Sequence, residues 1–397
     1  MSAMNSSAGS KAEGDISDTF ASLSGRKAQP LPDRFRELKL RLVNGHEDAV
    51  IASWKRLLTT LRTENDLIAR TGPAIIPEVR FSHLQDDLDT LKPEIKKRGV
   101  AVIRGVIPED EARAYKFEIE EYARQNPQTK GFPPSNPQVL ELYWSPAQIR
   151  ARAHPSLLQT QAALLQTLWH VSDPMFRMFQ GWLAISRSGP GRGTLLVNPL
   201  VRESGVYSLL RPFFGAKRTL EEVGGDRTRY LEEGNWEFLA GDRMTSELQG
   251  AMPGCAQEFT EGLHPHLALD RTMVHVPEVR PGDYVVWHCD TIHAVDKKHD
   301  GTSDSSVLYI PVCPTTKDSA EYVARQRTAF LQGTPAPDFP GGEGESRHIG
   351  RATEEYVKKY CDPVGVQSMG LDKLATAEGD TPGGKAVVEQ ANKVLGF

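Results

Sequence analysis

The chain has 397 residues, of which 39% are hydrophobic and 25% charged, the balance of a globular protein with a sizeable core. Its formal net charge of −5 gives no electrostatic basis for binding nucleic acid or an anionic membrane surface, and no apolar run approaches the roughly 18 residues that span a bilayer. Four scattered cysteines without a CxxC pair argue against a disulfide framework and against a zinc knuckle. We therefore expect a protein of a reduced, cytoplasmic compartment.

The first part of the chain is predicted to be helical around one buried strand. Residues 1–31 are rich in Ser, Ala, Gly and Asp, which predicts a disordered tail and not a signal peptide. Apolar residues three and four apart predict helices between Pro32 and Arg70. The run DDLDTLKPEIKKRG predicts another helix, which ends at Gly99 as a C-cap. VAVIRGVI then predicts a buried strand, and a helix opened by Pro108 follows.

The middle of the chain changes from a helical to a β pattern. SLLQTQAALLQTLWHVSD predicts a helix of about four turns. Short apolar runs between Gly/Pro turns then predict strands in MFQGWLAIS, GTLLVNPLV, VYSLLRPFF, TMVHVPEV, DYVVWHCDTIHAV and SSVLYIPVCP. Residues 215–255 are polar and Gly-rich, which indicates an insertion with a helix or two, and helical patterns return after residue 316.

These elements predict an α+β protein. Short strands separated by turns favour a double-stranded β-helix core (a jelly roll of the cupin type) over a parallel sheet, flanked by N- and C-terminal helices. We expect residues 32–315 to form this core domain with its N-terminal helices. Residues 316–397 are expected to form a helical extension packed on the same domain.

The segment PGDYVVWHCDTIHAV is the strongest candidate for chemistry, because His288, Asp290 and His293 lie within six residues. Together they have the ligand types of a facial iron triad. Strand geometry argues against that set, since side chains alternate between faces: His288 and Asp290 share one face while His293 points the other way. For His293, a ring hydrogen-bonded in the core is the simpler interpretation of the residue pattern alone.

A family resemblance gives this segment a more specific interpretation. A Pro-Gly-Asp turn followed by a strand that ends in a histidine resembles the Fe(II)/2-oxoglutarate-dependent dioxygenases, especially the phytanoyl-CoA-hydroxylase-like branch. Most of the chain is similar to the uncharacterised family named domain of unknown function 1479, through LWHVSDP, MFRMFQGWLAIS, GTLLVNPL, LLRPFF, LHPHLALDRTMVHVPEV, PGDYVVWHCDTIHAVDK and SDSSVLYIPVCP. The resemblance implies Fe(II), 2-oxoglutarate and a small organic substrate, with His293 as the distal metal ligand.

The chain departs from this pattern upstream of His293. The resemblance implies a His-x-Asp/Glu pair in several dozen residues between segments like LWHVSDP and MFRMFQGWL, but here the two are fused at Pro174–Met175. We therefore expect the pair to be missing and the β core to be incomplete. Three substitutes fit less well. His170 and Asp173 have the wrong spacing, and His264 and His266 flank a turn-forming proline. For His275, a packing role is the simpler interpretation.

A second departure concerns 2-oxoglutarate. The resemblance implies an Arg or Lys on the strand after the distal histidine, where it pairs bidentately with the C5 carboxylate. Here that strand reads SSVLYIPV, and Ser306 holds the place of the cation. Ser306 and Lys297 are therefore the expected cosubstrate-binding positions, with Lys298 and Arg192 as alternatives. A solvated surface charge is the simpler interpretation of each of these basic residues.

Three functions remain open. The first is an oxygenase that uses iron and 2-oxoglutarate on a small organic substrate. The second is a non-catalytic member that keeps the family scaffold without a complete metal site. The third is a jelly roll that binds an apolar ligand beside Trp182 and Trp287, for which core packing is the simpler interpretation. The sequence leaves the substrate and the oligomeric state open.

Overall fold

The protein is represented by a computed structural model, which describes residues 20–22, 27, 29–133, 135, 137–168, 176–339, 341–376 and 380–397. Most of the expected N-terminal tail lies outside these residues, as does the Pro174–Met175 junction. Where the tail segment is described, it contacts the body of the protein, because Phe20 forms a parallel bridge with Ala256.

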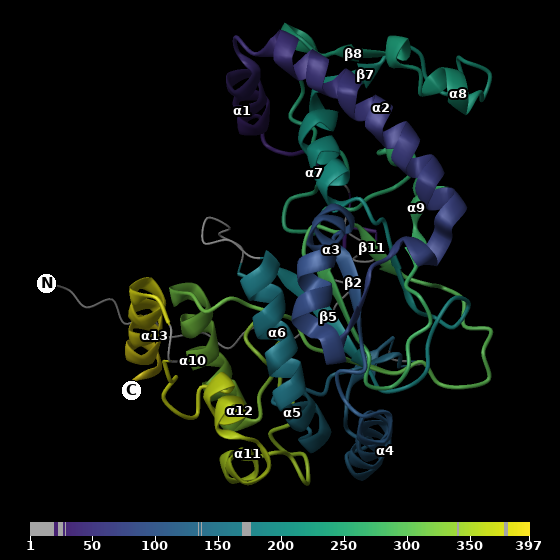
Figure 1. Ribbon diagram of the computed structural model, residues 1–397. Helices are drawn as coiled ribbons and strands as arrows, with labels where there is room; N and C mark the ends of the chain where they lie inside the picture. Colours follow the sequence, from purple (N-terminus) through teal and green to yellow (C-terminus); the bar gives the residue numbers. More distant parts are fainter. Residues whose placement is uncertain are drawn as a thin grey trace, which may run out of the picture.

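A five-stranded sheet that includes β2 and β5 forms the centre of the molecule (Figure 1). Its strand order is β1-β2-β10-β5-β12. The runs VAVIR and YVVWH are rich in β-branched and aromatic residues and are buried on both faces, which explains their place in the middle of the sheet. β1 and β2 are parallel, and the other neighbours are antiparallel. The strands are β1 (Glu78–Arg80), β2 (Val100–Arg104), β5 (Phe179–Ala184), β10 (Tyr284–His288) and β12 (Val307–Tyr309).

A three-stranded antiparallel sheet, in the order β11-β6-β9, packs on one face of this sheet. Its strands are β11 (His293–Val295), β6 (Leu195–Val197) and β9 (Val274–His275). Leu195 and Val197 share an apolar cluster with Trp182, Val285 and Trp287. These residues mark the facing sides of the two sheets, which we call the inner faces. Two small hairpins are also described: β3 (Gly131–Phe132) with β4 (Val139–Leu140), and β7 (Phe214–Ala216) with β8 (Trp236–Phe238).

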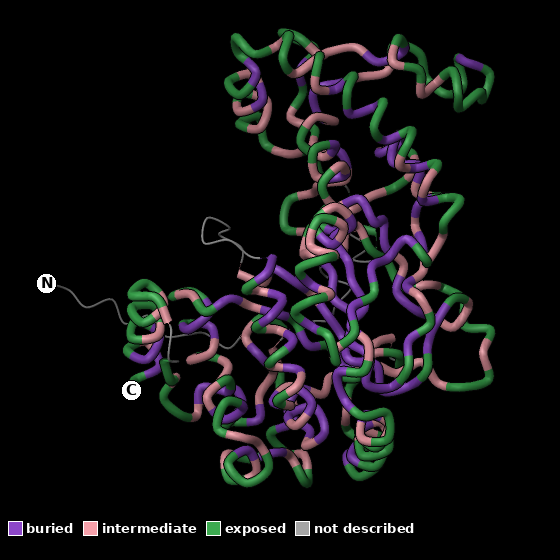
Figure 2. The backbone as a smooth tube through the Cα atoms, viewed as in Figure 1, coloured by how far each residue is buried: buried purple, intermediate pink, exposed green. Residues whose placement is uncertain are grey.

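Helices cover the outer face of the five-stranded sheet. Tyr284 and Val286 of β10 point to this face and share a second apolar cluster with Leu88 and Leu164. The covering helices are α3 (Leu84–Arg98), α4 (Glu109–Gln125), α5 (Pro146–Arg152) and α6 (Pro155–Leu168). Figure 2 shows the buried residues concentrated in the central strands and in the helix faces turned towards them. The helices therefore separate one side of the sheet from solvent, and the small sheet covers the other.

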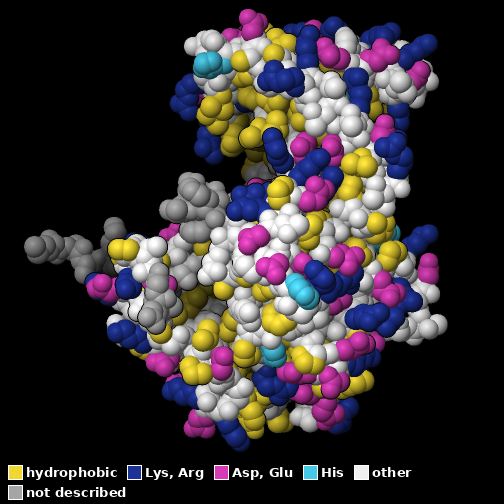
Figure 3. Space-filling model, viewed as in Figure 1, with side chains coloured by type: hydrophobic (Ala, Val, Ile, Leu, Met, Phe, Trp, Pro, Cys, Tyr) yellow, Lys and Arg dark blue, Asp and Glu magenta, His cyan; other side chains and the backbone are white. Residues whose placement is uncertain are grey.

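A helical lobe rises from the inner side (top of Figure 1). It contains α1 (Arg34–Val43), α2 (Glu47–Thr71), α7 (Val201–Leu210), α8 (Arg227–Tyr230) and the β7–β8 hairpin, with α9 (Leu269–Thr272) at its base. Apolar side chains gather on this lobe (Figure 3), and a groove there is lined by Leu40, Val43, Phe238, Leu239 and Met244.

The C-terminal helices pack beside the outer-face helices. They are α10 (Lys317–Gln332), α11 (Glu354–Tyr360), α12 (Pro363–Ser368) and α13 (Pro382–Leu395). Trp144 and Ile149 of the core region share a third apolar cluster with Phe330 and Val357 of this section. Short 3₁₀ turns connect the elements: η2 (Gly72–Ile75), η3 (Phe81–His83), η4 (Arg211–Phe213), η5 (Glu233–Asn235), η6 (Gly241–Arg243) and η7 (Pro265–Leu267).

The α+β class is confirmed, whereas a closed jelly roll is not formed by the described residues, whose sheets all keep free edges. The strand prediction for VYSLLRPFF is wrong for most of its length, because α7 and η4 occupy it and bury Tyr207 against Trp54. The polar stretch after residue 215 contains the β7–β8 hairpin as well as a short helix. Among the described helices, none combines the length and apolar character needed to cross a membrane.

Two buried histidines lie in the aromatic core of the upper lobe. The His266 ring packs edge-on against Trp54 and Trp236, with ring centroids 5.3 and 4.5 Å away. Burial, with nearby Arg211 adding repulsion, lowers the pKa of His264 to about 4 and that of His266 to about 3. Both rings are therefore neutral in the folded protein at pH values where the unfolded chain protonates them.

We predict that the free energy of unfolding falls by about 1.4 kcal/mol per pH unit for each of these histidines as the pH drops from about 6.5 towards the folded-state pKa. The stability is fully present above pH 6.5, because there neither state binds the proton. Denaturant unfolding at a series of pH values measures the slope. His266→Phe keeps an aromatic ring but cannot titrate, so its slope is shallower, and a slope equal to that of the wild type contradicts the assignment.

Candidate metal-ligand segment

The Pro-Gly-Asp turn that precedes β10 is locked by contacts with the end of β2. The Asp283 carboxylate accepts from the backbone N–H groups of Gly105 (2.8 Å) and Arg280 (2.9 Å) and from the Arg104 guanidinium (2.7 Å). Gly282 has a φ of +91°, and a Cβ there would lie 1.9 Å from the carbonyl oxygen of Ile107. The turn motif thus has a structural role, which is to fix where β10 begins.

The other end of β10 is held just as firmly. The backbone N–H of His288 donates to the carbonyl of Gly99 (2.8 Å), and that of Cys289 donates to the carbonyl of Met178 (3.0 Å). The Thr291 hydroxyl also donates to the Gly99 carbonyl (2.8 Å). Gly99 is in the left-handed region with a φ of +70°, and a Cβ there would lie 2.4 Å from Cβ of Val201. The turn between β10 and β11 therefore depends on a glycine at this position.

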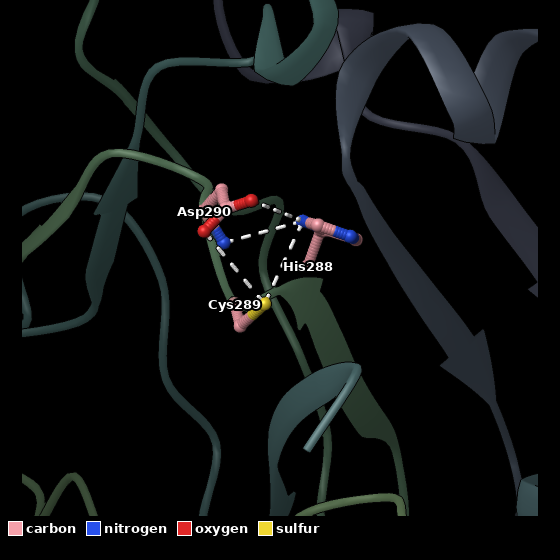
Figure 4. Close-up of side chains that lie close together, drawn as sticks. All are labelled: His288, Cys289 and Asp290. Carbon is pink, nitrogen blue, oxygen red and sulfur yellow. Dashed lines mark hydrogen bonds and ion pairs between the residues drawn. The ribbon is translucent and has the colours of Figure 1, made fainter. Parts of the chain in front are cut away.

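His288, Cys289 and Asp290 converge at this turn (Figure 4). Nδ1 of His288 lies 3.9 Å from the Cys289 sulfur and 3.8 Å from Oδ2 of Asp290, and the sulfur lies 3.8 Å from Oδ1 of Asp290. The backbone N–H of Asp290 donates to Nδ1 of His288 (3.2 Å), so that this nitrogen carries a lone pair directed towards the turn. Burial, assisted by the Asp290 carboxylate, raises the pKa of the Cys289 thiol to about 11.

His293 lies on the opposite side of the five-stranded sheet from His288. It is the register partner of Val197, so its side chain is on the inner face, and its ring lies 5.4 Å from that of Trp287. His288 instead follows Tyr284 and Val286 on the outer face, where its ring meets Phe179 edge-on at 6.2 Å. His293 is exposed, and its Nδ1 donates to the carbonyl of Thr291 (2.8 Å), which leaves Nε2 as the nitrogen available to a ligand.

The inner face is open along the edge strands β11 and β12. Val295 is the register partner of the buried Leu195, yet it is 63% exposed. Tyr309 is the register partner of the buried Trp182, yet it is 56% exposed. On both edge strands, side chains that point to the inner face are therefore exposed to solvent. We call His293, Val295 and Tyr309 the open edge.

The expected cosubstrate positions lie elsewhere. The backbone N–H of Ile185 donates to the carbonyl of Ser306, whose hydroxyl donates to Asp304 (2.9 Å), a carboxylate that pairs bidentately with Arg113 of α4. Ser306 therefore faces the outer, helix-covered side and not the inner face of His293. Lys297 is exposed in the loop after β11.

The other histidines considered do not complete a site at His293. His264 and His266 are buried in the upper lobe, and His275 pairs with Asp296 (Nε2 to Oδ2, 2.7 Å) on the outer face of the small sheet. His170 and Asp173 lie outside the described residues. Within the described residues, the group of His, Cys, Asp and Glu side chains close enough to share a metal ion is His288, Cys289 and Asp290, which does not include His293.

Sequence patterns do not predict two of these associations. The absence of a CxxC pair gives Cys289 no role, although its position between a histidine and an aspartate is a usable signal. The His275–Asp296 pair has no sequence signal, because the two residues meet only through their places on strands that flank β6.

A family profile and a protein of Escherichia coli match most of this chain. The sequence profile of the Gig2-like family matches residues 29–175 and 172–371. The uncharacterised protein YbiU of Escherichia coli strain K12 is 24% identical over 411 residues, which cover 79% of this chain and 90% of YbiU.

Two solved structures share the fold. GlcNAc Inducible Gene 2 (GIG2, DUF1479) from Candida albicans has a TM-score of 0.77 with 25% identity, covering 94% of this chain and 96% of that one. A hypothetical protein, JW0805 from Escherichia coli, has a TM-score of 0.66 with 21% identity, covering 90% of this chain and 100% of that one.

The role of Gly99 can be tested against a matched glycine. Gly99 and Gly105 both have a φ of +70°, but a Cβ at Gly105 meets nothing within 4 Å. We predict that Gly99→Ala destabilises the protein by about 1–3 kcal/mol more than Gly105→Ala, because only the former overpacks its surroundings. Denaturant unfolding of both variants measures the difference, and equal costs would show that the close approach at Gly99 is unimportant.

Proposed function

The chain belongs to the Gig2-like family, and we propose that it is a non-catalytic member of an Fe(II)/2-oxoglutarate-oxygenase-like fold that binds a small organic molecule at the open edge. The expected membership in domain of unknown function 1479 is confirmed, since the matching Candida albicans protein carries both names. The single observation behind the proposal is that His293 lies on an exposed inner face and, among the described residues, belongs to no group of three side chains that could share a metal ion.

The placement of His293 supports an oxygenase-type origin. It follows a Pro-Gly-Asp turn and a buried central strand, and it lies at the edge of the second of two facing sheets. In our proposal the core is a double-stranded β-helix from which the strands beside β11 and β12 are missing. Those strands would carry the upstream His-x-Asp/Glu pair that the resemblance implies.

The comparisons support a loss at one place in the chain. The two matches to the family profile meet and overlap at residues 172–175, which include Pro174 and Met175. The alignment with YbiU runs over 411 residues, more than the 397 of this chain, although it uses only 79% of it. The alignment therefore includes YbiU residues without a counterpart here.

The described residues do not fit the iron and cosubstrate that the resemblance implies. A facial triad needs a second histidine and a carboxylate beside His293. The His293 ring instead packs against Trp287 and donates to the Thr291 carbonyl, and within the described residues the group that could share an ion does not include it. Strand β12, Val307–Tyr309, carries no cation for a carboxylate of 2-oxoglutarate. We therefore derive no iron-dependent step for this chain.

Anaerobic titration of Fe(II) with 2-oxoglutarate tests the non-catalytic assignment. We predict that the visible charge-transfer band of a chelated iron complex is absent, and that His293→Ala gives the same spectrum as the wild type. His275→Ala serves as a control for a half-buried histidine outside the open edge. The proposal is contradicted if the wild type shows the band, His293→Ala loses it and His275→Ala keeps it.

Two features of the open edge favour binding of a small organic molecule. Val295 and Tyr309 expose apolar and aromatic surface beside their register partners, the buried Leu195 and Trp182. The buried indole Nε1 of Trp287 has no hydrogen-bond partner among the described residues. Because buried donors are nearly always paired, an acceptor group on a bound molecule is a reasonable partner for this N–H.

Titration with the dye anilinonaphthalene sulfonate tests this surface. We predict that Val295→Asp weakens dye binding by about tenfold or more, or about 1.4 kcal/mol, because a charge replaces apolar contact. Leu209→Asp is the matched control, since Leu209 is 73% exposed on α7, outside the open edge. Equal dye affinity in both variants would place the binding surface elsewhere.

A further inference from the structure

We propose that His288, Cys289 and Asp290 form a binding site for a divalent transition-metal ion of zinc type, on the opposite side of the sheet from His293. The ligand atoms of these three residues all lie within 4.8 Å of one another and come from one turn. This site goes beyond the proposed function, because it involves neither the open edge nor 2-oxoglutarate.

The spacing of the three ligand atoms suits a tetrahedral ion. Zinc lies about 2.1 Å from an imidazole nitrogen or a carboxylate oxygen and about 2.3 Å from a thiolate, so two of its ligands are roughly 3.5 Å apart. Nδ1 of His288 and the Cys289 sulfur are 3.9 Å apart, and each lies 3.8 Å from a different oxygen of Asp290. With one ligand atom taken from each residue, the three atoms all lie within 4.8 Å of one another. An ion would therefore draw the ligands together by up to about 1 Å, a shift that rotation of the exposed Asp290 side chain can supply.

The ligand types select the class of ion. A nitrogen, a sulfur and an oxygen together favour borderline ions such as zinc over Mg²⁺ and Ca²⁺, which prefer ligand sets made of oxygen alone. Cys289 binds as the thiolate, so its proton passes to solvent when the metal binds, with no change in oxidation state. Three protein ligands leave one position for water or another small ligand.

The surrounding structure holds the ligands in place before any ion arrives. His288 and Cys289 are fixed through their backbone N–H groups to Gly99 and Met178, on neighbouring segments of the sheet. The Asp290 N–H donates to Nδ1 of His288 and turns this nitrogen into the cluster (Figure 4), and an ion that binds Nδ1 would replace this hydrogen bond. Such support limits the ordering cost of binding, as in sites built on rigid elements.

Access to the site comes from one side. The side chain of His288 is 18% exposed, whereas that of Asp290 is 69% exposed. An ion can therefore enter past Asp290 while His288 and the half-buried Cys289 provide the inner ligands. A bound ion would tie the end of β10 to the turn that leads into β11.

Cobalt(II) is the probe of choice, because its spectrum reports thiolate ligands and tetrahedral geometry. We expect the reduced, chelator-treated full chain to show a thiolate-to-cobalt charge-transfer band that saturates at one equivalent and is abolished by zinc. Cys289→Ala loses the band, and Asp290→Asn weakens cobalt affinity by about tenfold or more. Cys255→Ala, which removes a half-exposed cysteine outside the cluster, keeps the band and the affinity.

The outcome that overturns the site is a wild type without the band, or a band that persists in Cys289→Ala. Cys289→Ser provides a second, nearly isosteric variant, and thermal melting with and without zinc provides a second measurement. We expect zinc to raise the melting temperature of the wild type and of Cys255→Ala but not of Cys289→Ser. Equal shifts in all three proteins contradict the proposal, whatever the result of the iron titration.

Discussion

Strand β10 is hydrogen-bonded on both sides, to β2 and to β5, and the position of the candidate ligands depends on this pairing. Its alternation sends Val285 and Trp287 to the inner face and Tyr284 and Val286 to the outer face. A slip of one residue would exchange the two faces, and the cost of moving Trp287 out of its cluster prevents it. His288 and His293 are therefore held on opposite sides of the sheet.

The anchors at the two ends of β10 make this register rigid. Gly282 and Asp283 fix its start against the end of β2, and Gly99 receives hydrogen bonds at its end. Both glycines have backbone conformations or contacts that a Cβ would disturb. The Pro-Gly-Asp motif is thus explained by packing alone, so its presence does not by itself require a metal site.

The sequence was informative where local pattern decides structure. Gly99 was recognised as a C-cap, and strand parity placed His288 and His293 on different faces. The sequence was misleading where tertiary packing decides the structure. VYSLLRPFF has the aromatic and β-branched residues of a strand, but it forms a helix for most of its length, because a helix buries Tyr207 against Trp54. The position of Ser306 was also beyond the sequence, because the direction of its side chain depends on the register of β12 with β5.

The open edge and the cluster at the turn give this chain two unlike surfaces on one scaffold. On the inner face, Val295 and Tyr309 are uncovered where a closed β core would bury them. On the outer face, His288, Cys289 and Asp290 form a compact set of three different ligand types. The proposed capacity for binding metal thus lies at the turn on the outer side, and among the described residues the group that could hold an ion does not include His293.

The most direct test is crystallography with anomalous diffraction, on crystals grown anaerobically and soaked in zinc or in Fe(II) with 2-oxoglutarate. We predict a zinc peak among the side chains of His288, Cys289 and Asp290, and no iron peak at Nε2 of His293. An iron peak at His293 with two further protein ligands would contradict the account, since it would show a complete triad on the inner face.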